Sequence, residues 1–167
     1  GLMLPLKDSD ADFAAMTVGN YLLGQSPLSS RLSVRVRGKD GLSYGVGSHV
    51  VASAVDPVGT FMIFAIINPA NIDKVDKAIA EEVNKFLAEG LSADELEQGK
   101  KAYLQSMKVS RGNDSALAGM LVKEMHAGRT MAYYDELEKR IEAVQPGDVK
   151  KAFDRLIDAK KLVIIEA

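Results

Sequence analysis

Cysteine and tryptophan are absent from the 167 residues, and the only histidines are His49 and His126. Without cysteine the chain cannot form disulfides, hold iron–sulfur clusters, bind zinc through thiolates or attack a substrate with a thiol. A catalytic zinc site needs about three protein ligands. The helical motifs H-E-x-x-H and H-x-x-E-H, which would supply two of them, are both missing. We therefore interpret both histidines as surface or structural residues and expect no metal site and no cofactor in this segment.

An excess of basic charge and long apolar runs are lacking as well. The 21 Lys and Arg residues are balanced by 23 Asp and Glu residues, which gives a net charge of -2. Dedicated nucleic-acid-binding domains are usually clearly basic, so we expect no nucleic-acid partner. The longest apolar run, residues 61–67, is far shorter than the ~20 residues that cross a bilayer, so we expect no membrane span.

Apolar residues at strand and helix spacing are abundant, and 47% of the chain is hydrophobic. Residues 42–55 and 59–67 are rich in Val, Ile and Phe and are joined by the turn sequence D-P-V-G, so they predict an antiparallel hairpin. Its second strand is apolar on both faces, which is typical of a central strand. Caps and stop glycines predict the remaining elements: a strand at 2–6, helices at 9–24, 30–40, 72–89, 92–110, 113–128, 130–144 and 145–157, and a closing strand at 161–167.

This order of elements predicts the α+β class. The strands are too few and too clustered for a doubly wound parallel sheet, so we expect a mostly antiparallel or mixed sheet with helices packed on one face. The length fits one domain over residues 1–167. Because the first strand has no turn or cap before it, we expect this domain to be a fragment of a longer chain.

The stretch S-S-R-L-S-V-R-V-R-G-K-D-G-L-S-Y-G-V-G-S, residues 29–48, contains Arg31, Arg35, Arg37 and Lys39. Its glycine spacing matches neither G-x-G-x-x-G nor G-x-x-x-x-G-K-[ST], and it leads into a strand. A phosphate loop requires a helix N-terminus behind it, so a glycine-rich phosphate loop is excluded here. The simplest interpretation of the basic residues is a solvated helix surface near a helix C-terminus, where the dipole favours cations. Phosphate or nucleic-acid binding is the alternative.

Arg37 and Tyr44 flank Gly41, where this helix is predicted to stop. A tight turn there can aim a guanidinium and a phenol at one point, as a site that stabilises an oxyanion on a peptide carbonyl requires. A tyrosine on a sheet edge beside an exposed arginine accounts for the same residues more simply. The physical argument alone leaves both interpretations open.

Residues 29–48 resemble the signature of the C-terminal, non-zinc domain of the insulinase/pitrilysin family of zinc metallopeptidases, which includes the mitochondrial processing peptidase. The resemblance rests on the S-R-L of residues 30–32, on Arg37, and on the G-L-S-Y of residues 41–44, whose tyrosine lies seven residues beyond that arginine. It extends in the family's order through the hairpin, residues 91–107 and residues 144–167. Relatives often show a Leu–Arg–Glu run where this chain has V-R-V-R-G, so Arg35 competes with Arg37, although the spacing to Tyr44 favours Arg37.

The resemblance implies a clamshell of two homologous α+β halves, or of two subunits, that closes around a peptide. The other half would hold zinc, and this half would contribute Arg37 and Tyr44 as substrate-binding residues that help to polarise the scissile carbonyl. It implies no catalytic residue in this segment alone and no activity in isolation. The alternative is a proteolytically inactive structural or assembly module of the same fold. Peptide specificity and compartment, bacterial periplasm or cytoplasm, stay open.

Overall fold

A three-stranded antiparallel sheet forms one layer of the molecule. The computed structural model describes residues 1–166, and its strands are β1 (Leu2–Leu4), β2 (Ser43–Ala52) and β3 (Gly59–Ile67) in the spatial order β1-β3-β2. The hairpin pairs Ala52 with Gly59 and Ser43 with Ile67, as the D-P-V-G turn predicts. The apolar strand β3 lies in the centre, which confirms its predicted place.

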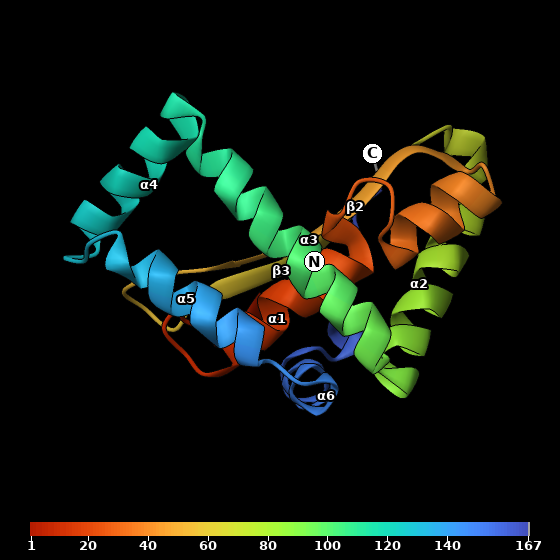
Figure 1. Ribbon diagram of the computed structural model, residues 1–167. Coiled ribbons are helices and arrows are strands. Elements are labelled where there is room, and N and C mark those ends of the chain that lie inside the picture. Colours follow the sequence, from red (N-terminus) through yellow and green to blue (C-terminus); the bar gives the residue numbers. More distant parts are fainter. Residues whose placement is uncertain (167) are drawn as a thin grey trace.

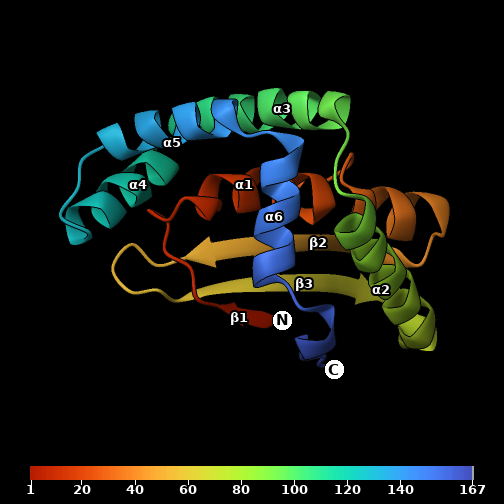
Figure 2. The same ribbon diagram turned by 90° about the horizontal axis from the view of Figure 1, so that it is seen from below.

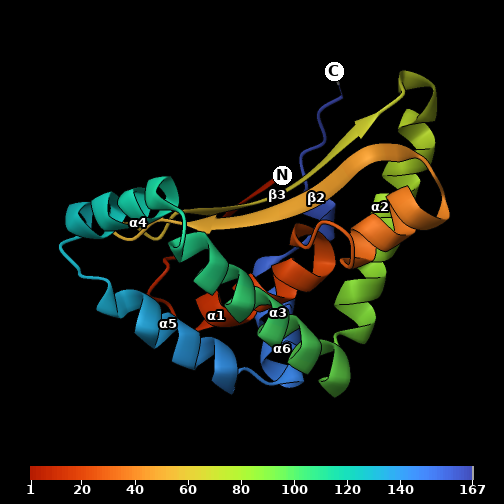
Figure 3. The ribbon, with the colours of Figure 1, turned by 45° about the horizontal axis from the view of Figure 1, so that its top comes forward.

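The helices pack on one face of this sheet, which confirms the α+β class (Figures 1 and 2). Phe61 of β3 and Phe153 of α6 are fully buried between the layers, together with Met16 and Val18 of α1. Figure 3 shows the opposite face of β2 and β3 without a covering helix. The helices are α1 (Asp12–Asn20), η1 (Tyr21–Gln25), η2 (Ser33–Lys39), η3 (Pro69–Asn71), α2 (Ile72–Glu89), α3 (Ala93–Arg111), α4 (Asp114–His126), α5 (Ala132–Ala143), α6 (Pro146–Leu156) and η4 (Ala159–Lys161).

Turn glycines and polar caps define the helix ends near the site. Gly90 ends α2 with φ +69°, a conformation that favours glycine. The Ser92 hydroxyl then accepts a hydrogen bond from the Glu95 amide at 3.1 Å and caps α3. A capping box of Ser92 and Glu95 is only half formed, because the Glu95 carboxylate turns to Arg31 instead of to the Ser92 amide. Within residues 1–166 no helix combines the length and apolarity needed to cross a bilayer.

The first helix differs from its prediction at both ends. Ala11 occupies the N-cap position, and the Asp10 carboxylate instead accepts a hydrogen bond from the Lys7 amide at 2.8 Å. At the other end, the helix continues beyond Asn20 as the π-helix η1 and passes through Gly24, the predicted stop. A Cβ atom at Gly24 would lie 2.3 Å from the Ser48 hydroxyl oxygen. Glycine is therefore needed there for the close approach of β2.

The predicted outer strands are shorter than expected or absent. β1 ends at Leu4 because the next residue, Pro5, has no amide hydrogen for the ladder. The closing strand predicted at 161–167 is not formed over residues 161–166, and Ala167 lies outside the described residues. Within the described part, Gly1 and Val163 exchange two backbone hydrogen bonds of 2.8 and 2.9 Å. A longer ladder would need a neighbouring strand beyond Gly1.

Candidate functional site

The turn between η2 and β2 positions the predicted site residues. Val36 is fully buried and anchors η2 against the core, and its carbonyl accepts a hydrogen bond from the Leu42 amide at 2.9 Å. Between them Gly41 adopts φ +62°, so it ends the helix as predicted. The seven residues of η2 are π-helical, a rare conformation that occurs frequently at functional sites.

Arg37 lies on the exposed side of η2 and lines a hollow of about 250 Å³. The hollow lies between the end of η1, η2 and the first half of β2, and its other lining residues are Gly24, Gln25, Pro27, Ser33, Gly45, Val46, Gly47, Ser48, His49 and Phe64. Of the two lining glycines in β2, Gly45 is partly exposed and has open space where a Cβ atom would lie, whereas Gly47 is buried. Arg37 also borders a neighbouring hollow with Pro27 and Leu28.

Tyr44 lies at the beginning of β2, where pairing with β3 is irregular. The register shifts between Ser43 and Gly45, and the Ser43 hydroxyl accepts a hydrogen bond from the Gly45 amide at 3.0 Å. A bulge of this kind redirects a side chain, and the Tyr44 side chain is 80% exposed. Arg37, near the end of η2, and Tyr44, at the start of β2, therefore lie on either side of this turn. Tyr44 is not among the residues that line the hollow beside Arg37, and no hydrogen bond joins the two side chains among the described residues.

The other two arginines of the stretch are held by carboxylates. Arg31 donates two hydrogen bonds of 2.8 Å to Glu95 and a third, of 2.9 Å, to the carbonyl of Gly90. Its guanidinium also lies 5.1 Å from the centre of the Phe86 ring. The hydrogen bond to Glu95 is the main cause that raises the pKa of Arg31. Arg31 thus connects the start of the η2 segment to α2 and α3, rather than belonging to a freely solvated surface.

Arg35 forms ion pairs with Asp40, at the end of its own helix, and with Glu81 of α2 at 3.0 Å. The hydrogen bond with Glu81 is the first cause of its raised pKa, and the charge of Asp40 adds to it. The pairing of Arg31 and Arg35 with carboxylates weakens the phosphate-binding alternative, because a phosphate would have to displace those carboxylates.

Close backbone packing forms the floor of the hollow. A Cβ atom at Gly47 would lie 2.9 Å from the Phe64 ring. Next to it, the buried Ser48 hydroxyl donates a hydrogen bond of 2.7 Å to the Asn20 side-chain oxygen, which connects β2 to the end of α1. A Cβ atom at Gly47 would also lie 3.3 Å from the Gly24 carbonyl oxygen, so Gly47 and Gly24 allow β2 to approach η1 closely.

The histidines have no metal partners in the described structure. His49 is exposed and stacks on Phe64 with the ring centres 5.3 Å apart, and His126 is exposed at the end of α4. Within residues 1–166 no group of three or more His, Cys, Asp or Glu side chains is arranged to hold a metal ion.

A buried ionic cluster on the far side of the domain was not predicted. Asp8 is fully buried and accepts hydrogen bonds of 2.7 and 2.9 Å from Arg129, whose Nε donates to Glu124 at 2.7 Å. The Arg129 guanidinium lies 3.8 Å from the Tyr133 ring centre. Burial raises the pKa of Asp8, but the hydrogen bond from Arg129 and the charge of Lys123 outweigh burial, so the pKa is lowered. Asp8 and Arg129 are 121 positions apart in the sequence, and no local sequence pattern connects them.

Comparisons with known proteins agree with this architecture. A family model described as the peptidase M16 inactive domain matches residues 1–103, which include Arg37 and Tyr44. An uncharacterised zinc protease of Streptomyces coelicolor is 32% identical over 137 residues, which are 81% of this chain and 29% of that protein. The chain thus spans less than a third of the length of this curated relative.

Two solved structures show the same fold. The peptidase M16 inactive domain from Pseudomonas fluorescens superposes with a TM-score of 0.78 at 24% identity, over 93% of this chain and 37% of that chain. A protease from Helicobacter pylori gives a TM-score of 0.74 at 20% identity, over 92% of this chain and 36% of that chain.

Proposed function

The chain belongs to the peptidase M16 inactive-domain family, and from this premise we propose that it binds extended peptide in an active site shared with a zinc-bearing homologous half. In this proposal Arg37 and Tyr44 hold the substrate backbone and help to polarise the scissile carbonyl. The zinc, and the group that activates water, come from the other half, because the histidines described above offer no ligand set. The isolated chain then has no peptidase activity.

The state of Arg37 is the observation that carries the proposal. Of the three arginines in the signature stretch, Arg31 and Arg35 are held by carboxylates, whereas Arg37 has no ion-pair partner among residues 1–166. It borders a hollow in which Gly45 of β2 is partly exposed. Because Arg37 is exposed and has no ion-pair partner among these residues, its charge is available to a ligand, whereas the competing candidate Arg35 is already engaged.

The chemistry of the pair suits a peptide carbonyl. A guanidinium presents a rigid fork of donors, and a phenol adds one directional donor. Donors aimed at a developing oxyanion become effective when water is excluded, since the local dielectric constant falls. Tyr44 is 80% exposed in this chain alone, so closure of the second half over the turn would supply that exclusion.

The test uses the intact protease with Arg37→Ala and Tyr44→Phe introduced separately. Loss of one oxyanion donor typically lowers kcat by about 10²–10³-fold, and we expect a decrease of at least about tenfold for each variant. Unchanged thermal unfolding would show that neither substitution acts through the fold. Arg37→Lys should recover only part of the activity, because an ammonium group cannot reproduce the fork.

Lys39→Ala is the matched control, since it removes a cation from the same exposed end of η2. Its turnover should equal that of the unmodified protease. Normal turnover in both the Arg37 and Tyr44 variants would refute the site assignment and favour a structural or assembly role for the domain. An equal loss in the Lys39 variant would indicate a general charge effect instead of a specific contact.

A further inference from the structure

The turn between η2 and β2 contains Asp40-Gly41, the one place in the sequence where glycine follows an aspartate. Aspartate followed by glycine is the dipeptide whose backbone isomerises most readily, because glycine has no side chain to shield its amide nitrogen. Gly41 is exposed, and a Cβ atom added to it would meet no atom within 4 Å. The dipeptide therefore has the chemistry and the surroundings of a site of spontaneous modification.

The reaction at such a dipeptide conserves atoms. The Gly41 nitrogen attacks the Cγ atom of the Asp40 carboxyl group, and a C–N bond forms while the amide hydrogen and the carboxyl hydroxyl leave together as water. The product is a five-membered succinimide ring, which a second water molecule opens at either carbonyl carbon. Opening at the backbone carbonyl leaves the chain connected through Cβ and Cγ, as isoaspartate. The mass is then unchanged, but the backbone contains one more carbon atom.

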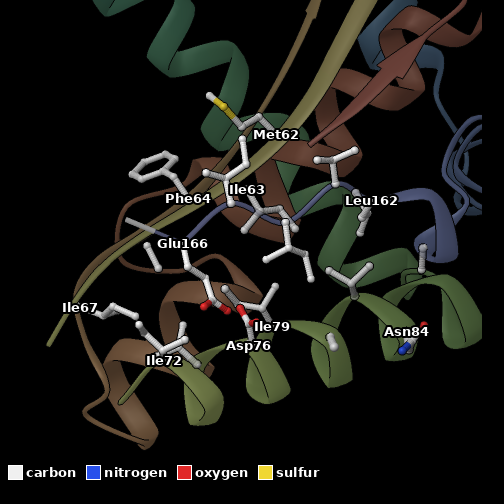
Figure 4. A pocket seen from close by; sticks show the side chains of 18 of the residues that line it. Met62, Ile63, Phe64, Ile67, Ile72, Asp76, Ile79, Asn84, Leu162 and Glu166 are labelled. Atoms are coloured by element: carbon white, nitrogen blue, oxygen red, sulfur yellow. The ribbon is translucent and has the colours of Figure 1, made fainter. Parts of the chain in front are cut away.

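Arg35 holds the carboxyl group that would have to react. Its Nη1 atom donates hydrogen bonds to both carboxylate oxygens of Asp40, and its Nη2 atom donates to Glu81 at 3.0 Å. Glu81 belongs to α2, which forms one wall of the apolar groove in Figure 4 and packs beside η2. The guanidinium is thus anchored to a second helix while it binds Asp40, whose side chain is only 20% exposed.

The backbone of the turn opposes ring closure as well. Asp40 has a helical ψ of -17°, and the chain must rotate about its Cα–C bond before the Gly41 nitrogen can reach Cγ. Two hydrogen bonds restrict that rotation, from the Asp40 amide to the Arg35 carbonyl at 3.1 Å and from the Leu42 amide to the Val36 carbonyl at 2.9 Å. Modification therefore requires release of the carboxylate from Arg35 and rotation of the backbone.

We propose that Asp40-Gly41 is a site of isoaspartate formation and that Arg35 protects it by holding the Asp40 carboxylate. The ion pair of Arg35 then preserves the covalent structure of the turn, in addition to joining η2 to α2. Only the consequence for peptide binding rests on the proposed function. An added backbone carbon between Arg37 and Tyr44 would displace these two side chains relative to each other.

Prolonged incubation of the intact protease at neutral pH, without substrate, tests the proposal. Isoaspartate is quantified by transfer of a labelled methyl group with an isoaspartate-specific carboxyl methyltransferase, and peptide mapping assigns it to residue 40. Arg35→Ala and the more conservative Arg35→Gln both remove the ion pair with Asp40. Glu81→Gln is the matched control, since it removes the other ion pair of Arg35 and leaves Asp40 paired. Asp40→Glu supplies the blank, because its longer side chain cannot close a five-membered ring.

We expect residue 40 to be the first aspartate modified, and both Arg35 variants to form isoaspartate there about threefold faster, as loss of one exposed ion pair allows. Glu81→Gln should change the rate less. Equal rates in the unmodified protease and the Arg35 variants, or earlier modification of another aspartate, would overturn the proposal. An equal increase in the Glu81 variant would overturn it too, because attachment of η2 to α2 would then control the rate. None of these rates depends on turnover, so they are separable from the Arg37 and Tyr44 assays.

Discussion

Replacing Asp8 with asparagine tests whether the buried ionic cluster holds the N-terminal segment to the helices. The substitution keeps the shape of the side chain but removes its charge. Arg129 keeps at most one of its two hydrogen bonds to residue 8, because an amide has one acceptor oxygen, and it retains Glu124 and the Tyr133 ring. Lys123, 3.3 Å from the carboxylate, loses its ion pair as well.

The expected loss of unfolding free energy follows from the burial of this ion pair. Breaking a buried ion pair by removing one partner costs about 3–5 kcal/mol, because the remaining charge is left without compensation. The Arg129 side chain is 22% exposed and keeps its ion pair with Glu124, so its charge is partly compensated and the lower end of the range, about 3 kcal/mol, applies. For a domain of this size that loss lowers the Tm by about 6–12 °C.

Urea denaturation measures the loss as a shift of the midpoint at constant m-value. Asp154→Asn is the matched control, since its ion pair with Lys150 is solvent-exposed and should contribute less than about 1 kcal/mol. If Asp8→Asn cost no more than this control, the cluster would not stabilise the fold, and the reasoning from its burial would be refuted.

Three further predictions concern the pH dependence of stability and the helix contacts of the signature stretch. The pKa of Asp8 lies below its ordinary 3.8, so its contribution to stability is complete above pH 3.8 and is lost as the pH falls through the lowered folded value. Asp8→Asn should therefore make the free energy of unfolding depend less on pH in this acid range, as measured by unfolding at several pH values. Burial, aided by Tyr134 and Tyr21, raises the pKa of Tyr103 to about 12, so its contribution to stability is complete below pH 10 and is lost as the pH rises towards 12. Tyr103→Phe should therefore reduce the loss of unfolding free energy between pH 10 and pH 12. Arg31→Ala removes hydrogen bonds to Glu95 and Gly90 and should cost about 2 kcal/mol in urea unfolding, whereas Lys39→Ala should cost almost nothing.

The elements that could be predicted from sequence are those whose signals are local. The hairpin follows from two stretches rich in β-branched and aromatic residues joined by a proline turn, and Gly41 and Gly90 end their helices because their positive φ angles favour glycine. The prediction that Gly24 ends the first helix was wrong, because glycine is required there by the close contact with Ser48 of β2 and not by a turn. The prediction of a closing strand at 161–167 was wrong over residues 161–166 for a related reason. A strand needs a neighbouring strand to pair with, and the local sequence does not show whether one is present.

Sequence could propose residues for the candidate site but could not predict their positions. The resemblance selected Arg37 and Tyr44, but their positions depend on the π-helical form of η2 and on the irregular start of β2, which no sequence pattern indicated. The engagement of Arg31 and Arg35 depends on carboxylates 64 and 46 residues away in the chain. The Asp8 cluster likewise joins residues whose proximity only the tertiary fold creates.

The π-helical turn also determines how much length variation this part of the molecule tolerates. In η2 the Asp40 amide bonds to the carbonyl of Arg35, five residues earlier, so the turn holds one residue more than an α-helical turn. Deleting one residue there would favour ordinary α-helical bonding and rotate Arg37 away from the hollow, while insertion into the following turn would reverse the faces of β2. The seven-residue interval from Arg37 to Tyr44 therefore fixes where the two side chains lie relative to each other. Homologues should accept substitutions within this interval more readily than insertions or deletions.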